Sequence, residues 1–401
     1  MTHATVLPLP STTGVSASVS PIELRVERAR SIRDIDQGEW NALIPRDEPH
    51  LRYAFLEALE TSGQCRESHY FRVFSGSELV GAAVAYHLRV DLLTLAPRKY
   101  TAWIDAVRSR IAPNLLFMGS LTCGPIVTNC RSNVYVSPLL DPTTGHNACL
   151  QIIAAVQATP KAPGLTLFFE FDDRQAEVFA PAFFDSGFLQ GVSLPGTFLD
   201  VRWNSLEQYV QLMRKAFRRT VVKDQAMAAD LEFVVVDDFT EIADEAYALY
   251  RNVVRRADYV LQELTLEFFR AIAPITESRL VVARERGSER IVGIELLLRG
   301  ETVLQDVFTG LDYARNAEQH LYFNLIYPVI GYAGEQGFRR LSLGQTSYTF
   351  KSRLGVGVFP LWLFVKHRNP VVQRVLVTLK SMLFPPTKTA SHKVFRDETP
   401  S

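Results

Sequence analysis

Alternating and helical patterns of apolar residues are clearest in residues 289–353. The dipeptide Gly300-Glu301 separates two strand-like runs there and is typical of a two-residue hairpin turn. The elements predicted in this stretch are a strand at 290–299, a strand at 302–309, a long helix at 316–336 and a short buried strand at 341–343. A polar loop that ends at Lys351 follows the last strand. The predicted α/β unit is therefore followed directly by polar side chains that are candidates for a functional site.

The rest of the chain also alternates between strands and helices. Predicted strands lie at 22–29, 69–74, 79–88, 165–171, 197–201, 231–236, 279–284 and 359–366. Predicted helices lie at 34–43, 53–61, 148–158, 176–186, 205–229, 241–256 and 265–273. This order indicates an α/β protein with mixed sheets flanked by helices.

The two halves of the chain resemble each other. Residues 67–81 and 277–293 both run from Glu-Ser through a Ser-Glu turn into a strand that contains Val-Gly. Residues 184–188 and 350–354 are also similar, and each is followed by a proline and a strand. Such correspondences in the same order predict a duplicated unit. The expected organisation is a disordered leader at 1–21, a first lobe at 22–196, a second lobe at 197–370, and an amphipathic helix with a disordered tail at 371–401.

Two carboxylates face each other in the predicted hairpin, because its register places Glu295 directly opposite Asp306. Both side chains then share a largely apolar face, where facing carboxylates destabilise a sheet unless they share a proton or meet a cation. A carboxyl group whose pKa is raised in this way is a candidate general base. The alternative is a structural ion pair with Lys351 or Arg353, and a bulge in the hairpin would separate the two carboxylates.

Residues 214–219 and 343–351, together with the duplication, resemble the double-GNAT acyltransferases. This group includes the BioF2-like acetyltransferase domain and the FemAB-like peptidyltransferases. The resemblance covers about residues 25–369 and implies two lobes, each a mixed sheet flanked by helices. It further implies that the second lobe is catalytic and the first is a degenerate, structural copy. The implied activity is direct acyl transfer to an amine, without a covalent enzyme intermediate.

The resemblance also implies roles for individual residues. A carboxylate on a central strand is often the general base of GNAT enzymes, a role that Asp306 or Glu295 would match. A backbone N–H of the strand at 302–309 would meet the donor carbonyl. Tyr348 would protonate the leaving group, and ordinary packing with a hydrogen-bonded hydroxyl is the alternative. The residues expected to bind substrate are Gln345, Lys351, Arg353, His320 and Arg218.

Two of these substrate-binding residues have structural alternatives. A lone histidine such as His320 is more often structural than catalytic. Arg218 belongs to a basic helix face that would meet a phosphopantetheine phosphate, an acidic carrier protein or a nucleotide, or only solvent.

The expected acyl donor is a thioester of CoA or of an acyl carrier protein, and the expected acceptor is a small-molecule amine. Residues 311–319 correspond to the usual pyrophosphate-binding turn of GNAT enzymes but contain no glycine. A phosphate cradle needs backbone N–H groups that side chains do not obstruct, so this run departs from the family pattern. An aminoacyl-tRNA ester, as in FemAB-like peptidyltransferases, is an alternative donor, although the sequence contains no helical arm for tRNA. A non-catalytic scaffold that binds a carrier protein or a membrane is a third reading.

Composition excludes several classes of protein. The 401 residues include 43 basic and 43 acidic side chains, which argues against a mainly electrostatic DNA-binding protein. The four cysteines show neither CxxC pairs nor metal-ligand spacing with histidine, so no metal is expected. Without a secretory signal or an apolar run of membrane-spanning length, a cytoplasmic protein is expected. Residues 371–384 predict a helix with one apolar face. This face would pack on the protein's own domain, dock on a partner protein, or make weak contact with a membrane surface.

Overall fold

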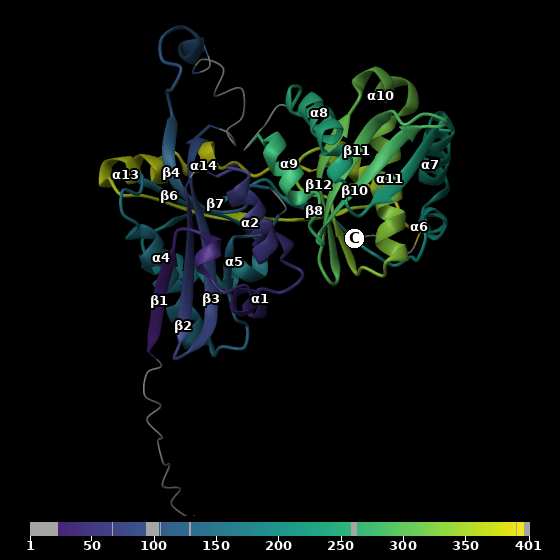
Figure 1. Cartoon of the computed structure of the whole chain (residues 1–401). Coiled ribbons are helices and arrows are strands. Elements are labelled where there is room, and N and C mark those ends of the chain that lie inside the picture. Colours follow the sequence, from purple (N-terminus) through teal and green to yellow (C-terminus); the bar gives the residue numbers. More distant parts are fainter. Residues whose placement is uncertain are drawn as a thin grey trace, which may run out of the picture.

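The computed structural model describes residues 23–65, 67–93, 104, 106–127, 130–257, 263–389 and 391–396. The predicted leader at 1–21 lies outside the described residues. Two mixed sheets flanked by helices form two lobes that pack against each other (Figure 1). This arrangement confirms the predicted fold class.

The first sheet has the strand order β1-β2-β3-β4-β6-β15-β7, with β5 pairing alongside β3. Its strands are β1 (Leu24–Ala29), β2 (Ser68–Ser75), β3 (Glu78–Asp91), β4 (Phe117–Cys123), β5 (Val134–Val136), β6 (Leu165–Phe171), β7 (Leu189–Val192) and β15 (Trp362–His367). Among the strand pairs that the structure describes in this sheet, only β4 and β6 run parallel. Helices α4 (Pro142–Gln157) and α5 (Asp173–Asp185) bury their apolar faces on this sheet in one cluster with Phe168 and Phe364.

The second sheet repeats this plan, in the order β9-β10-β11-β12-β13-β8-β14. Its strands are β8 (Gly196–Asp200), β9 (Leu231–Val236), β10 (Ser278–Glu285), β11 (Ile291–Arg299), β12 (Val303–Leu311), β13 (Arg340–Ser342) and β14 (Gly357–Phe359). Again a single pair, β12 with β13, is parallel, and it holds the same position in the order as β4 with β6. The tandem arrangement that the sequence predicts is therefore present.

The two lobes exchange one strand each. β15 follows the last strand of the second sheet in sequence, yet it inserts between β6 and β7 of the first sheet. β8, which follows β7, takes the corresponding place between β13 and β14 of the second sheet. The predicted second lobe at 197–370 therefore does not hold for residues 362–367, because their hydrogen-bonding partners lie in the first sheet.

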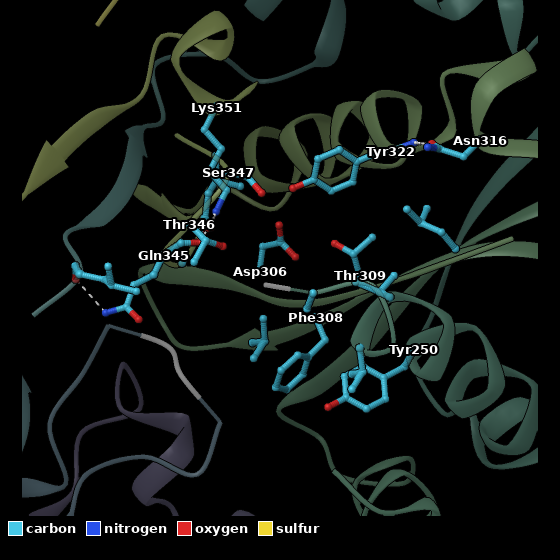
Figure 2. A pocket seen from close by; sticks show the side chains of 18 of the residues that line it. Tyr250, Asp306, Phe308, Thr309, Asn316, Tyr322, Gln345, Thr346, Ser347 and Lys351 are labelled. Carbon is cyan, nitrogen blue, oxygen red and sulfur yellow. Dashed lines mark hydrogen bonds between the residues drawn. The ribbon is translucent and has the colours of Figure 1, made fainter. Parts of the chain in front are cut away.

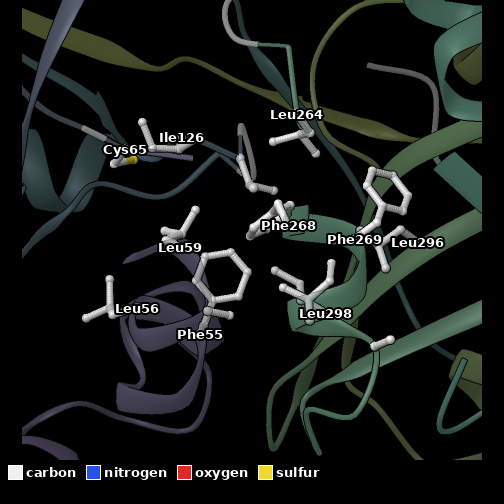
Figure 3. Packing of buried hydrophobic residues seen from close by; sticks show 14 of the residues in the cluster. Phe55, Leu56, Leu59, Cys65, Ile126, Leu264, Phe268, Phe269, Leu296 and Leu298 are labelled. Carbon is white, nitrogen blue, oxygen red and sulfur yellow. The ribbon is translucent and has the colours of Figure 1, made fainter. Parts of the chain in front are cut away.

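A large apolar cluster joins the lobes. Phe55 and Leu59 on α2 (Tyr53–Thr61) meet Phe268 on α9 (Leu266–Ile272) and Leu298 on β11 (Figure 3). The rings of Phe55 and Phe268 pack edge to face with centroids 5.9 Å apart. The other helices of this interface are α1 (Gln37–Leu43) and α8 (Ala243–Val254). Burial of this size fixes one lobe against the other.

Two predicted long helices are each divided into two. Their bounds are Leu206–Leu212 for α6, Lys215–Met227 for α7, Tyr313–Gln319 for α10 and Leu321–Glu335 for α11. Met213, between α6 and α7, is extended and forms a β-bridge with Phe395. His320, between α10 and α11, has a left-handed backbone with φ 45°. The predictions of single helices at 205–229 and 316–336 are wrong because apolar spacing continues across both breaks.

The C-terminal segment packs on both lobes. Helices α13 (Pro370–Thr378) and α14 (Lys380–Leu383) bury Leu376 and Leu383 in a cluster with strands of the first sheet. Further on, Val394 and Phe395 are buried in the apolar core of the second lobe. The predicted disordered tail is therefore wrong for these residues, because they fill a gap beside Met213.

The described part of the chain contains no helix that is both long and apolar enough to cross a membrane. All four cysteines are buried free thiols. Burial raises the pKa of Cys65 and of Cys149 to about 12, so these two stay protonated and weakly nucleophilic at neutral pH.

Candidate active site

The hairpin that carries the two carboxylates closes more widely than its sequence predicts. Asp47 of the first lobe accepts hydrogen bonds from the backbone N–H groups of residues 301–303, at 2.7–3.0 Å. Arg299 pairs with Leu304 instead of the predicted Thr302. The predicted two-residue turn is wrong because a contact with the other lobe holds the turn open.

A β-bulge then brings Asp306 and Thr309 to one face of β12. Asp306 pairs with Leu297, whereas Glu295 pairs with Thr309, and Val307 has no partner in this register. The predicted arrangement of Glu295 directly opposite Asp306 is therefore wrong. The bulge does not separate the two groups, however, because their carboxyl groups are hydrogen-bonded diagonally across the strands.

Both carboxyl groups titrate abnormally. The exposed fraction is 0% for Glu295 and 9% for Asp306. Burial, together with the charge of Asp306, raises the pKa of Glu295 well above its ordinary value, while burial raises the pKa of Asp306 to about 6. The Thr309 hydroxyl donates to the Glu295 carboxyl oxygens, at 2.9 and 2.8 Å. Burial and the mutual repulsion of the two groups therefore favour a state in which the pair shares one proton.

A buried cation balances this charge. Lys351, on α12 (Tyr348–Lys351), donates from its Nζ to the carbonyl oxygens of Leu343 and Gln345, the latter at 2.8 Å. Burial lowers the pKa of Lys351, and the charge of Asp306 opposes that shift. Lys351 reaches down towards Asp306 in Figure 2, and its charge lowers the pKa of that carboxyl group. Lys351 forms no ion pair with Asp306 or Glu295, so the alternative of a structural ion pair is not found, and the lysine acts on Asp306 only through its nearby charge.

A pocket of about 420 Å³ opens where β12 and β13 part. Their parallel pairing ends at Gln305 and Ser342, and residues 306–309 and 343–347 beyond it line the pocket. Asp306 and Thr309 lie on one side of β12, and Phe308 lies on the other side with Tyr250 of α8 (Figure 2). Polar side chains therefore line the pocket from one face of the sheet, and apolar side chains line it from the other face.

Tyr322 on α11 is a pocket residue that the sequence interpretation missed. Its hydroxyl points towards Ser347 and Asp306 in Figure 2, and it receives a hydrogen bond from the Ser347 side chain. Burial raises the pKa of Tyr322, so the phenol stays protonated at neutral pH. Nothing in the apolar spacing distinguishes this tyrosine, because its direction depends on the break at His320.

The polar loop after β13 is held in an unusual shape. Gly344, Thr346 and Ser347 all have left-handed backbones, with φ of 67°, 64° and 51°. For residues other than glycine this conformation costs energy, and such strain tends to occur at functional sites. Gln345, which lines the pocket, donates from its side chain to the carbonyl of Leu194 at 2.9 Å.

Tyr348 lies away from the pocket lining. Its hydroxyl donates to the carbonyl of Pro195 at 2.8 Å, and burial raises its pKa to about 12. The predicted role of Tyr348 as the acid is thus not supported by its position. The alternative of packing with a hydrogen-bonded hydroxyl describes it.

Three other predicted substrate-binding residues also lie outside the pocket lining: Arg353, His320 and Arg218. His320 Nδ1 is 2.8 Å from the Asp224 carboxylate, which also accepts from the Tyr327 hydroxyl at 2.9 Å. The structural alternative for His320 therefore fits, since it links α7 to α11.

The glycine-free run after β12 forms the start of α10. Asp312 is its N-cap and accepts from the backbone N–H of Ala314 at 3.0 Å. Arg290 donates to the same carboxylate at 2.8 Å. An acidic side chain thus occupies the helix end at which GNAT enzymes hold a pyrophosphate, and it takes up a backbone N–H group that a phosphate would use.

One group of potential metal ligands occurs among the described residues. Atoms of Glu67, His69 and His87 lie within 4.8 Å of one another in the first lobe. The two imidazole Nε2 atoms are 3.2 Å apart. Residue spacing did not indicate this group because the β2–β3 pairing assembles it, and none of its members lines the pocket of the second lobe.

The second lobe is similar to a known family of domains. Residues 211–352, which carry the whole pocket loop and both carboxylates, match the acetyltransferase (GNAT) domain family. The second lobe therefore resembles a GNAT domain, and the strand plan of its sheet is repeated in the first lobe. A crystal structure of FemX matches with a TM-score of 0.57 and 10% identity, over 87% of this chain and 99% of that one.

A second similar structure is the C-terminal domain (DUF2156) of a protein assigned as a lysylphosphatidylglycerol synthetase in Agrobacterium fabrum. It matches with a TM-score of 0.53 and 13% identity, over 90% of this chain and all (100%) of that one. No curated protein matches the sequence. At these identities the two structural matches show that the two-lobed fold is shared over most of this chain and nearly all of each matched chain.

Proposed function

We propose that the second lobe transfers an acyl group from a thioester donor to an amine, with Asp306 as the general base. The observation that carries this proposal is the position of Asp306, which lines the pocket while hydrogen-bonded to Glu295 and facing the charge of Lys351. A pKa of about 6 suits a base that works near neutral pH. Glu295, which is fully buried and retains its proton, acts as a positioning residue for Asp306.

The reaction would use two pocket side chains for its proton transfers. Asp306 removes a proton from the amine, whose nitrogen attacks the donor carbonyl to form the C–N bond. The C–S bond then breaks, the departing thiolate takes a proton from the Tyr322 hydroxyl, and the cycle closes when solvent returns a proton to Tyr322 and accepts the one held by Asp306. The hydrogen bond that Ser347 donates to this hydroxyl would stabilise the transient tyrosinate. We assign the acid role to Tyr322 in place of Tyr348 because only Tyr322 lines the pocket.

The bulge offers a group for the carbonyl oxygen. Val307 lines the pocket and has no partner in either the β11 or the β13 register. Its backbone N–H is therefore the candidate donor to the oxyanion that forms during attack.

The donor we favour is an acyl-carrier-protein thioester over an acyl-CoA. Asp312 occupies the start of α10, where a CoA diphosphate would need exposed N–H groups. A carrier protein presents its thioester on an arm with one phosphate and makes much of its contact through its own surface. A non-catalytic scaffold would gain nothing from two buried carboxyl groups and a buried lysine beside a pocket, although burying them costs free energy.

Aminoacyl transfer is the second candidate function. The same base and acid would serve an ester donor, with an alcohol as the leaving group in place of a thiol. The missing glycine turn and the fold shared with FemX and the lysylphosphatidylglycerol synthetase domain favour this candidate. Sensitivity of the reaction to RNase would support it over thioester chemistry.

Donor screening tests the proposal. The purified protein is heated with acetyl-CoA, longer acyl-CoAs, acyl-carrier-protein thioesters or aminoacyl-tRNA, and the unfolding temperature is recorded. We expect stabilisation by the carrier-protein thioester and, with an amine present, product formation that Asp306→Asn abolishes. Equal turnover by a folded Asp306→Asn protein would remove Asp306 as the base.

A further inference from the structure

A second pocket, of about 200 Å³, lies in the first lobe. Its walls are mostly aliphatic and aromatic side chains from β3, β6 and β15, and from the residue after α14. They include Leu88, Leu167, Phe169, Leu363, Val365 and Phe384. The pocket is smaller than a typical site for a drug-sized ligand, so it suits a slender apolar group.

The two pockets occupy the same place in the two sheets. In the first sheet the parallel pairing of β4 with β6 ends at Cys123 and Phe168, and in the second sheet that of β12 with β13 ends at Gln305 and Ser342. The second-lobe pocket lies beyond its last parallel pair. The first-lobe pocket reaches the same end of its sheet at Phe169 and Glu170, and it continues along the paired strands past Leu167 and Thr122. The first-lobe pocket therefore includes the position that corresponds to the candidate catalytic pocket.

Backbone conformation supports this match. Glu170 and Gly344 each stand two residues beyond the last parallel pair, and their φ angles are 66° and 67°. By the same count Gly124 is the counterpart of Asp306. A Cβ atom at Gly124 would lie only 2.0 Å from the ring of Phe169, so an apolar ring fills the space beside it. The position that corresponds to Asp306 therefore carries no carboxyl group in the first lobe, although the buried carboxyl group of Glu170 lines the pocket elsewhere.

The two pockets share a wall. Leu194 and Gln345 line both of them, and the Gln345 side chain donates to the Leu194 carbonyl. The two pockets are therefore neighbours on either side of the Gln345–Leu194 contact.

We propose that the first-lobe pocket binds the aliphatic chain of a substrate whose reactive group lies in the second-lobe pocket. This inference rests on the proposed function and names a class of substrate for it, a molecule with a straight hydrocarbon chain. The chain belongs either to the acyl donor or to the amine acceptor, since both reach the same pocket.

Binding measurements test this without relying on catalysis. Displacement of the fluorescent fatty acid cis-parinaric acid is measured with S-acyl pantetheine thioesters and with alkylamines, each with 4 to about 16 carbons. Burial of each added methylene should tighten binding about fourfold until the pocket is full. The series that shows this gain identifies which substrate carries the chain. No gain in either series would overturn the proposal.

Variants locate the binding. Leu167→Trp fills the pocket and should weaken long-chain binding by more than about tenfold, because losing two methylene sites already costs roughly 16-fold. Leu92→Trp, at a half-buried position of the same wall, repeats the test if Leu167→Trp is unfolded. Val178→Trp, on the exposed side of α5 at 61% exposure, is the matched control and should bind normally. Normal long-chain binding by both wall variants would overturn the proposal.

Asp306→Asn separates this inference from the proposed function. We expect this variant to bind long chains normally while losing activity. Normal chain binding with full activity would contradict the catalytic role of Asp306 and leave the chain pocket intact. If Asp306→Asn loses activity but ligand binding does not depend on chain length, the catalytic role of Asp306 stands and the chain pocket is contradicted.

Discussion

Three ionisable side chains around β12 depend on one another for their charge. Asp306 lines the pocket, Glu295 lies behind it, and Lys351 approaches it from α12. Burying a charge costs free energy, so each group shifts its pKa towards its neutral form unless a partner opposes the shift. Asp306 receives a hydrogen bond from Glu295 and the field of Lys351, and it is accordingly the carboxylate that ionises more readily.

Substitution of each carboxyl group by its amide distinguishes the base from its neighbour. Asp306→Asn should lower kcat by about a hundredfold to ten-thousandfold, because the pocket loses its proton acceptor. Glu295→Gln should lower it by less than about tenfold, because the amide still donates a hydrogen bond to Asp306. Steady-state kinetics on folded variants measure both. Asp200→Asn, at an exposed carboxylate of β8, is the control and should be fully active. The reverse order of effects would make Glu295 the base.

The pH dependence follows from the pKa of Asp306. Below about pH 6 this group is protonated and cannot accept a proton, so kcat/KM should fall tenfold per pH unit on the acid side. Lys351→Met removes a charge that lowers this pKa, so the acid limb should move to higher pH and activity should recover in alkali. Lys366→Met, in the first lobe, should leave the limb in place. An unmoved limb in Lys351→Met would show that the lysine does not set the charge of Asp306.

For single residues of the candidate site, the sequence predicts which chemical groups are present better than it predicts how they are arranged. Glu295, Asp306 and Lys351 are found from strand alternation and motif position, and the structure brings all three together. Tyr322 could not be found, because its direction depends on a left-handed residue at His320. Tyr348, the tyrosine that the sequence indicates, lies outside the pocket lining, because its hydroxyl donates to the carbonyl of Pro195.

Among the elements, the β11–β12 hairpin decides where these groups lie. Its turn is held by Asp47, which accepts three backbone hydrogen bonds and one from the Thr302 hydroxyl at 2.7 Å. A local rule for a Gly-Glu turn cannot include a partner from the other lobe, so the register was predicted incorrectly. The strands themselves were predicted well, because alternation depends only on which face is buried.

Asp47→Ala tests this long-range support. The variant leaves three turn N–H groups and a hydroxyl without their acceptor, so we expect the free energy of unfolding to fall by about 2–3 kcal/mol. Activity should also fall, because the turn fixes the register of Asp306. Asp141→Ala, which removes an ordinary helix cap from α4, should cost about 1 kcal/mol and leave activity unchanged. Denaturant unfolding and kinetics measure both effects. Equal behaviour of the two variants would show that Asp47 is only a local cap.

For the whole molecule, the strand exchange ties the lobes into one unit. The duplication could be predicted from repeated short motifs, and the sheet orders confirm it. The exchange could not, because a strand carries no local signal for which of two similar sheets it joins. β15 follows β14 by only two residues, yet it crosses to the first sheet and fills the gap between β6 and β7.

Phe364 on β15 tests whether the first lobe depends on the end of the chain. Its ring stacks on Phe183 with centroids 4.1 Å apart and is fully buried in the first-lobe core. Phe364→Ala should lower the free energy of unfolding by about 3–5 kcal/mol, the usual cost of such a cavity. Hydrogen exchange should then quicken in β6 and β7, far earlier in the sequence, and change little in β13. Leu199→Ala on β8 is the reciprocal control, because its side chain packs in the second-lobe core. Faster exchange confined to the second sheet in Phe364→Ala would contradict the exchange of strands and would make β15 a part of the lobe that precedes it in sequence.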